Sequence, residues 1–194
     1  LALRCGAALV VPAAFDGRAL ATACREHAVT VLPLAPRQVA ALLECAARED
    51  LATVRHAFCD GARTAPELLA RWRERFGAPL YAGWGRAELA PVATISLHDI
   101  ESGNWLHAGS KPSAVGRALS GVALRVVDRE RLDPREPLPP GELGRLFVRG
   151  PGVMAGYLDD PAATARVLRD GWFDTGLTAR VDKDGFLFLE APAA

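Results

Sequence analysis

The sequence predicts an α/β fold in which a mostly parallel sheet with flanking helices is followed by a β-rich, barrel-like lobe. In the first half of the chain, short apolar runs alternate with amphipathic helical patterns, whereas strands, turns and glycines dominate from about Val92 onward. The 194 residues, half of them hydrophobic, are enough for one hydrophobic core or two small ones. We therefore expect an α/β subdomain over residues 1–95, incomplete at its N-terminus, and a β-rich lobe of the same domain over residues 96–194.

Four strands are expected in the first half, over Ala8–Val11, Val29–Leu34, Val54–Cys59 and Pro79–Ala82. The first of them is read as a buried strand, so the sequence is expected to start inside a domain.

Three helices separate these strands. Asp16 is placed to cap the first helix, and the second follows Pro36. The third is expected over Pro66–Phe76, where Thr64 is followed three residues later by a glutamate in a capping-box pattern. Gly77 is placed to end that helix.

The second half reads as strands joined by turns and one short helix that opens at Asp160-Pro161. Strands are expected over Val122–Val127, Leu143–Val148, Ala179–Val181 and Phe186–Leu189. The last two flank Asp182–Gly185 as a hairpin, and residues 128–140 form a charged, proline-rich connection.

Composition gives no sign of a nucleic-acid partner or of a membrane span. The formal net charge is zero, and the chain lacks any run near the ~18 apolar residues of a transmembrane helix. The four cysteines form no C-x-x-C pair, so a zinc site is not expected. Their spacing is typical of reduced thiols, and we expect a cytoplasmic protein.

Three segments, in order along the chain, carry a resemblance to a known family. They are Trp84–Glu88, Gly141–Leu158 and Gly171–Gly185, and the segment Val115–Gly121 fits the same pattern. Together they resemble the AMP-forming acyl-activating (adenylate-forming) superfamily. The residues of these motifs are more similar to those of acyl-CoA and acyl-carrier-protein synthetases than to those of the adenylation domains of peptide synthetases. The resemblance implies an internal fragment of the large N-terminal domain.

The resemblance implies a ligase that uses ATP and Mg²⁺. In this family a carboxylic acid attacks the α-phosphate of ATP, pyrophosphate leaves, and the acyl-adenylate passes its acyl group to the thiol of CoA or of a carrier protein. Charge develops on phosphate oxygens, which explains the need for Mg²⁺ and for hydrogen-bond donors. Fatty-acid metabolism is one expected setting, and other domains of the same synthase are further expected partners. The acyl substrate and the choice of thiol stay open.

Within the first motif, Glu88 matches the family's magnesium ligand and is the candidate catalytic residue. Trp84 occupies the position of the family's aromatic residue that stacks on adenine, and Gly85 matches the glycine that follows it in the motif. Ala87 replaces a threonine that contacts the α-phosphate. The loss of such a donor costs about 3 kcal/mol of transition-state stabilisation.

Two further places match the nucleotide site in degenerate form. Asp60-Gly61-Ala62 stands where the family has a Gly-Gly-Ala turn at the edge of the adenine pocket. Leu177 stands where an aspartate accepts the ribose hydroxyls, and leucine cannot accept them. Asp174, three residues earlier, is expected to point elsewhere.

The family's phosphate-binding loop would precede Leu1, and its mobile C-terminal domain, which carries a catalytic lysine, would follow the last hairpin. Neither is recognised in this sequence, and the glycines of 150–156 read as tight turns rather than a phosphate cradle. One hypothesis is therefore an acyl ligase fragment that is incompetent alone, and whether it binds ATP or Mg²⁺ stays open. The other is a catalytically dead adenylation-like scaffold of a larger synthase. Serine-hydrolase and Rossmann motifs are not found.

Overall fold

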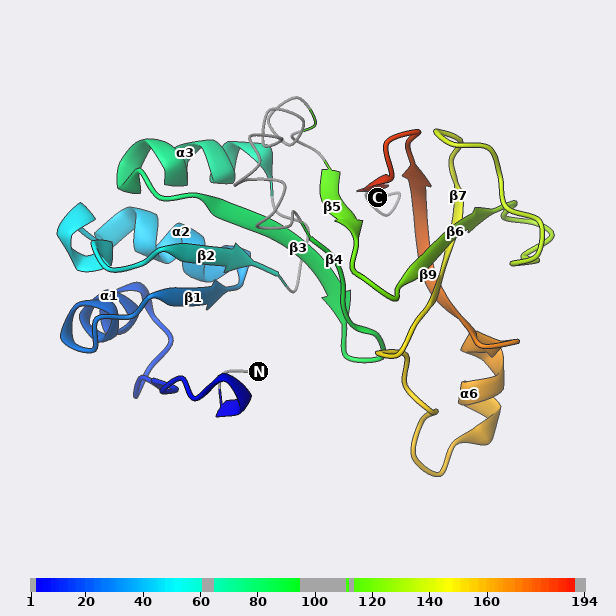
Figure 1. The fold of residues 1–194 in the computed structure, drawn as a ribbon, viewed down its shortest axis with the longest axis horizontal. Helices are drawn as coiled ribbons and strands as arrows, with labels where there is room; N and C mark the ends of the chain where they lie inside the picture. The colour runs from blue at the N-terminus through cyan, green and yellow to red at the C-terminus, as the bar shows by residue number, and fades with distance from the viewer. Residues whose placement is uncertain (1–2, 61–64, 95–110, 112–113, 191–194) are drawn as a thin grey trace. The chain divides into compact units, whose positions relative to one another are not determined.

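The computed structural model describes residues 3–60, 65–94, 111 and 114–190, drawn as a ribbon in Figure 1. The chain divides into two compact units, Leu1–Ala82 and Gly83–Ala194. The first holds a parallel sheet with helices and the second an antiparallel sheet, so the predicted fold class is confirmed. The predicted boundary between residues 95 and 96 lies outside the described ranges and stays a prediction.

The unit Leu1–Ala82 is built from a parallel sheet and three α-helices in its described part. Strand β1 (Val31–Leu34) pairs with β2 (His56–Cys59), and β2 pairs with the first half of β3 (Leu80–Arg86). The helices are α1 (Gly17–Glu26), α2 (Pro36–Cys45) and α3 (Pro66–Phe76), with short 3₁₀ helices η1 (Leu3–Cys5) and η2 (Arg48–Leu51). Helix α2 packs against both α1 and α3 (Figure 1).

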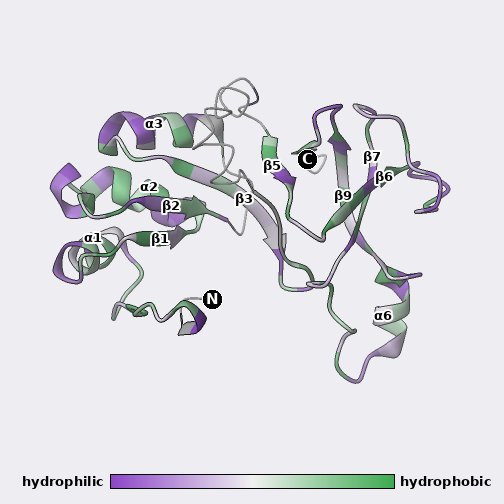
Figure 2. Ribbon diagram, in the orientation of Figure 1, coloured by the Kyte–Doolittle hydropathy of each residue, from purple (hydrophilic) through white to green (hydrophobic). Residues whose placement is uncertain are grey.

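Local signals in the sequence explain where these helices begin and end. The Asp16 carboxylate accepts a hydrogen bond from the Ala19 amide at 2.8 Å, as expected of an N-cap. Gly77 ends α3 in the left-handed conformation, with φ of 70°, and its amide donates to the Arg73 carbonyl oxygen at 2.9 Å. Each helix carries hydrophobic and hydrophilic faces (Figure 2), and the hydrophobic residues join a core that includes the fully buried Leu42 and Trp72.

Two expectations for this unit are wrong. Residues 8–11 form no strand, and the side chains of Leu9 and Val11 are 66% and 69% exposed. A strand needs a neighbour for its backbone N–H and C=O groups, and β1 pairs only with β2 among the described strands. The N-cap position of α3 is Ala65 rather than Thr64, which lies outside the described residues.

The unit Gly83–Ala194 is an antiparallel sheet with one short helix. Its strand path starts with the second half of β3 and continues β4-β5-β10-β9-β7-β6, with β8 paired to β9. The bounds are β4 (Ala90–Thr94), β5 (Ala114–Ala118), β6 (Ala123–Val127), β7 (Gly144–Arg149), α6 (Pro161–Val167), β8 (Leu168–Arg169), β9 (Trp172–Val181) and β10 (Phe186–Leu189).

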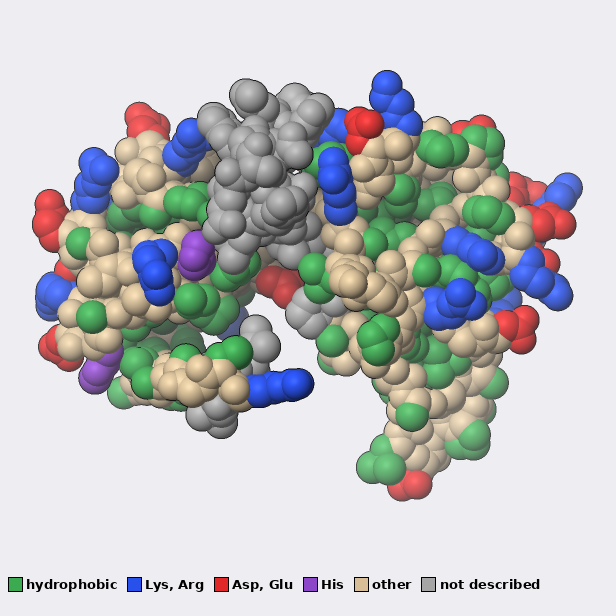
Figure 3. Space-filling model, viewed as in Figure 1, with side chains coloured by type: hydrophobic (Ala, Val, Ile, Leu, Met, Phe, Trp, Pro, Cys, Tyr) green, Lys and Arg blue, Asp and Glu red, His purple; other side chains and the backbone are tan. Residues whose placement is uncertain are grey.

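The hairpin predicted around Asp182–Gly185 and the helix predicted after Asp160 are confirmed. The strand predicted over Pro79–Ala82 is longer, because β3 continues to Arg86 and therefore contains most of the first motif. Charged side chains of both signs are interspersed over the visible face of this unit (Figure 3), in keeping with the zero net charge. None of the helices in the described ranges is both long enough and apolar enough to cross a membrane.

Candidate active site

Glu88 lies in the tight turn that joins β3 to β4. Arg86 pairs with Ala90 across the hairpin, and the Leu89 amide donates to the Arg86 carbonyl oxygen at 3.0 Å. Ala90 follows with a left-handed φ of 55°. The hydrogen bond between Leu89 and Arg86 closes a four-residue β-turn over Arg86–Leu89. The turn places Glu88 at the end of the hairpin, outside the ladder of backbone hydrogen bonds.

The Glu88 carboxylate has a partner on each oxygen. The Tyr157 hydroxyl donates to Oε1 at 3.1 Å, and Arg86 Nε lies 3.5 Å from Oε2. A hydrogen bond from the amide of Glu88 itself, together with these two partners, outweighs partial desolvation and holds the pKa of Glu88 below its ordinary value of 4.5. Glu88 is therefore ionised at neutral pH and able to bind a cation.

The second motif supports the backbone of this turn. The Met154 amide donates to the Glu88 carbonyl oxygen at 2.8 Å. At Gly152, a Cβ atom would lie only 2.6 Å from the Leu89 carbonyl oxygen, so the close approach of the two segments requires glycine there. Gly152 thus lies in a turn that packs on the hairpin, which agrees with the turn interpretation.

The third motif is joined to the same hairpin by Arg86. Its Nη1 donates to the Thr175 carbonyl oxygen at 2.6 Å. Pairing of β9 with β7 shifts register around Thr175, whose hydroxyl donates to the Leu146 carbonyl oxygen at 2.8 Å. Gly176 follows with a φ of 77°. The segment Thr175–Leu177 is therefore an irregular part of β9, linked to the Glu88 turn through one guanidinium group.

Leu177, at the predicted ribose-acceptor position, is half-buried against the hydrophobic core of the lobe. Asp174 does not take its place, because the residue is only 7% exposed and its carboxylate is already bound. Arg145 Nε lies 2.6 Å from Asp174 Oδ1, and the Gly176 amide donates to the same oxygen at 3.0 Å. The expectation that Asp174 points elsewhere agrees with this ion pair.

The other residues of the first motif lie on the same hairpin. Trp84 is 7% exposed and packs in the lobe core with Leu89 and Val115. Gly85 lies in β3 at a register shift, and Ala87 lies in the exposed turn beside Glu88. A methyl group at Ala87 offers no hydrogen-bond donor. The structure thus brings Trp84, Gly85, Ala87, Glu88 and Leu177 into one unit.

Asp60 belongs to the other unit, immediately after β2. Its amide donates to the Leu34 carbonyl oxygen at 2.9 Å, which continues the pairing of the parallel sheet. Gly61 and Ala62 lie outside the described residues. The role of all three at the adenine pocket stays a prediction.

Arg86 and Tyr157 are functional candidates that the sequence reasoning missed. Arg86 occupies a variable position of its motif, and Tyr157 belongs to a segment that was read as structural. Both lie within motifs that carry the resemblance, which was the available signal. Their contact with Glu88 depends on tertiary pairing across 69 residues of sequence in the case of Tyr157.

The donor set around Glu88 is compatible with Mg²⁺. This cation is commonly held by one or two carboxylates together with substrate phosphates and water, not by an all-protein cage. Within the described residues, no group of three or more His, Cys, Asp or Glu side chains is placed to hold a metal ion. A single ionised carboxylate whose side chain is 18% exposed is compatible with a cation that arrives with a nucleotide.

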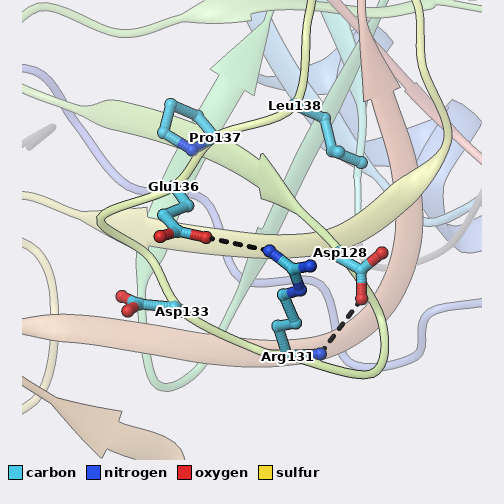
Figure 4. A pocket seen from close by; sticks show the side chains of 6 residues that line it. All are labelled: Asp128, Arg131, Asp133, Glu136, Pro137 and Leu138. Atoms are coloured by element: carbon cyan, nitrogen blue, oxygen red, sulfur yellow. Dashed lines mark hydrogen bonds and ion pairs between the residues drawn. The ribbon is translucent and has the colours of Figure 1, made fainter.

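A hollow of about 270 Å³ lies elsewhere in the lobe, along the 128–138 connection (Figure 4). Its carboxylates already have partners: Asp128 accepts from the amide of Arg131 at 3.0 Å, and Glu136 Oε2 lies 3.5 Å from Arg131 Nη1. Asp133 likewise binds Arg135. These contacts stabilise the loop itself, so we do not include the hollow in the candidate active site.

Comparison with known proteins agrees with the motifs. A family model described as AMP-binding enzyme matches residues 1–158. A feruloyl-CoA synthase from Amycolatopsis sp is 35% identical over 187 residues, which make up 95% of this chain and 35% of the relative. An indoleacetate–CoA ligase from Aromatoleum aromaticum is 33% identical over 192 residues, 97% of this chain and 35% of the relative.

A solved structure agrees as well. The amide bond synthetase McbA from Marinactinospora thermotolerans superposes with a TM-score of 0.77 at 35% identity, covering 91% of this chain and 34% of that one. The chain thus spans about a third of the length of these relatives. The resemblance to AMP-forming acyl-CoA synthetase-like proteins is confirmed, and the chain belongs to the AMP-binding enzyme family.

Proposed function

We propose that this chain forms part of an ATP-dependent, AMP-forming ligase that activates a carboxylic acid as an acyl-adenylate and transfers the acyl group to a thiol. The observation that carries the proposal is the convergence of all three motifs on the turn that bears the ionised carboxylate of Glu88. Tyr157 and Met154 come from the second motif, and Arg86 connects the turn to Thr175 in the third. Such convergence supports a shared site better than a purely structural role for each motif.

In this proposal Glu88 holds Mg²⁺ together with the phosphates of ATP. When bound, the cation supplies positive charge to the phosphate oxygens on which negative charge develops. Tyr157 and Arg86 keep the carboxylate ionised and oriented. Trp84 is the candidate contact for adenine, although its side chain packs in the lobe core and the residue is only 7% exposed. Four free cysteine thiols support a reducing compartment, the cytoplasm.

Two substituted positions lead us to propose that this chain does not catalyse adenylation by itself. Ala87 cannot donate to the α-phosphate, and Leu177 cannot accept the ribose hydroxyls. We expect no ATP–pyrophosphate exchange above the blank with ferulate, indoleacetate or a long-chain fatty acid as substrate. These acids are chosen from the names of the relatives and from the family's general chemistry. Exchange with any of them would overturn the proposed incompetence.

A catalytically dead scaffold is the second candidate. It is favoured by the packing of Leu177 into the lobe core and by the commitment of Asp174 to Arg145, which leave the ribose position apolar. The two candidates differ in what happens when the lost groups are restored. The double substitution Ala87→Thr and Leu177→Asp, placed in the whole protein that contains this chain, should raise exchange if the site is an attenuated enzyme. No increase in a folded double variant would favour the scaffold.

A further inference from the structure

We propose that Tyr157 is a positioning residue whose hydroxyl fixes the orientation of the Glu88 carboxylate for a divalent cation. The inference rests on the proposed function, in which Glu88 binds the cation that accompanies ATP. It concerns a segment that sequence reasoning treated as structural, the stretch Gly156–Thr164 that leads into α6.

The contact between the two side chains is direct. The Tyr157 hydroxyl donates to Glu88 Oε1 at 3.1 Å, and within the part of the chain that the structure describes this is the one hydrogen bond of that hydroxyl. The Tyr157 residue is 38% exposed, so burial of the ring does not by itself explain its place. The ring is partly exposed and its hydroxyl contacts a carboxylate, so we infer that Tyr157 is placed there for this hydrogen bond rather than for packing.

The backbone of Tyr157 is held by the first turn of α6. Its amide donates to Thr164 Oγ1 at 2.9 Å, and that same hydroxyl donates to the Asp160 carbonyl oxygen at 2.9 Å. Asp160 in turn caps α6 by accepting from the Ala163 amide at 2.8 Å. The helix end therefore fixes the point from which the phenol extends.

Gly156 makes this arrangement possible. A Cβ atom there would lie 3.0 Å from both Oγ1 and Cγ2 of Thr164, closer than ordinary van der Waals contact. The chain can thus pass near enough to Thr164 for the amide of the next residue to reach its hydroxyl. The four residues Gly156, Tyr157, Asp160 and Thr164 act as one support.

The chemistry of the donor also suits a cation site. A carboxylate has about four lone-pair positions, so one hydrogen bond from a neutral hydroxyl orients it and leaves both its charge and other lone pairs for a metal. Arg86 is the competing partner, but its Nε lies 3.5 Å from Oε2 and its side chain is 39% exposed, so it holds the carboxylate more weakly.

The test measures Mn²⁺–ATP affinity by electron paramagnetic resonance on the 194-residue chain and its variants. Tyr157→Phe keeps the ring and removes the hydroxyl, and we expect affinity to fall about three- to tenfold. Thr164→Val should lower it in the same direction, whereas Thr164→Ser, which keeps the hydroxyl, should preserve it. Leu158→Ala, at a 91% exposed neighbour, is the matched control with no expected change. Thermal unfolding checks that each variant is folded.

A second readout separates this inference from the proposed function. The ¹³C signal of the Glu88 carboxylate, assigned with Glu88→Gln, should shift in Tyr157→Phe even without nucleotide. Loss of Mn²⁺–ATP binding in Glu88→Gln with unchanged affinity in folded Tyr157→Phe would overturn the positioning role. If the wild type and Glu88→Gln bind Mn²⁺–ATP equally, or if neither binds it, the proposed function is refuted. The ¹³C shift of the Glu88 carboxylate in Tyr157→Phe would then decide whether Tyr157 orients Glu88. An unchanged carboxylate signal would refute the inference outright.

Discussion

Leu177→Asp is the change that tests the proposed nucleotide site most informatively. Leu177 lies in the irregular part of β9, half-buried against the lobe core, at the position where the family resemblance implies a ribose acceptor. The substitution supplies the missing carboxylate and removes an apolar contact. We therefore expect tighter binding of MgATP and a less stable fold in the same variant.

The two effects have different magnitudes. A hydrogen bond to a charged acceptor contributes about 1.5–3 kcal/mol, so one ribose hydroxyl bound by the new carboxylate would tighten MgATP at least about tenfold. Full burial of a leucine side chain contributes about 1.5–3 kcal/mol, and a half-buried one about 1 kcal/mol. For a chain of this size that loss lowers Tm by about 2–4 °C.

Calorimetric titration with MgATP and thermal unfolding measure both effects. Thr178→Asp is the matched control, because it adds the same charge one residue later, where the side chain of a strand points to the other face. Leu177→Asn has nearly the same side-chain shape as Leu177→Asp but no charge, so it separates the effect of the charge on MgATP affinity from that of the shape. If folded Leu177→Asp binds MgATP no more tightly than the wild type, the assignment of this position to the ribose is wrong.

Three further outcomes are expected. Ala90→Gly should raise the free energy of unfolding by about 1 kcal/mol in urea titrations, since Ala90 has a left-handed φ of 55°; an equal or lower value would contradict the strain. Gly152→Ala should lower Tm and weaken MgATP binding, because its Cβ would meet the Leu89 carbonyl oxygen at 2.6 Å; unchanged binding and Tm would show that the segments separate freely. Burial alone would raise the pKa of Asp182, but hydrogen bonds from Lys111 Nζ at 2.6 Å and from backbone amides outweigh it and hold this pKa below 3.8. The resulting stability is present above the unfolded pKa of about 4 and is lost as pH falls through the folded one. The Tm difference between the wild type and Lys111→Met should therefore shrink between pH 7 and pH 3, and a constant difference would rule this out.

Local signals made much of the fold predictable. Asp16 and Asp160 cap helices as their sequence positions indicate, and Gly77 ends a helix in the left-handed conformation that glycine favours. The turn at Asp182–Gly185 likewise follows from its residues. Each of these features depends on atoms within four residues of one another, which a sequence displays directly.

Features that depend on distant partners were less predictable. Residues 8–11 have the composition of a strand but form none, because the described sheet gives them no neighbour. Strand β3 extends through Arg86 because its residues Gly83–Arg86 pair with β4, whereas Leu80–Ala82 pair with β2. Strand length and existence are thus decided by pairing more than by the residues themselves.

The candidate site shows the same division. Resemblance predicts Glu88 as the candidate ligand, whereas the contacts of Arg86 and Tyr157 depend on how the hairpin, β9 and the segment before α6 come together. Arg86 lies within a motif but at its variable position, and a tyrosine in a glycine-rich stretch is equally typical of packing. Hydrogen bonds between side chains far apart in sequence are set by the tertiary fold.

The most direct test of the central claim, that Glu88 is the surviving metal–nucleotide ligand, is calorimetric titration of the chain with ATP in the presence of Mg²⁺ and, separately, of EDTA. We expect weak binding that requires Mg²⁺ in the wild type and that is abolished in a folded Glu88→Ala variant. Binding of equal strength in both proteins, or binding that EDTA leaves unchanged, would contradict the claim.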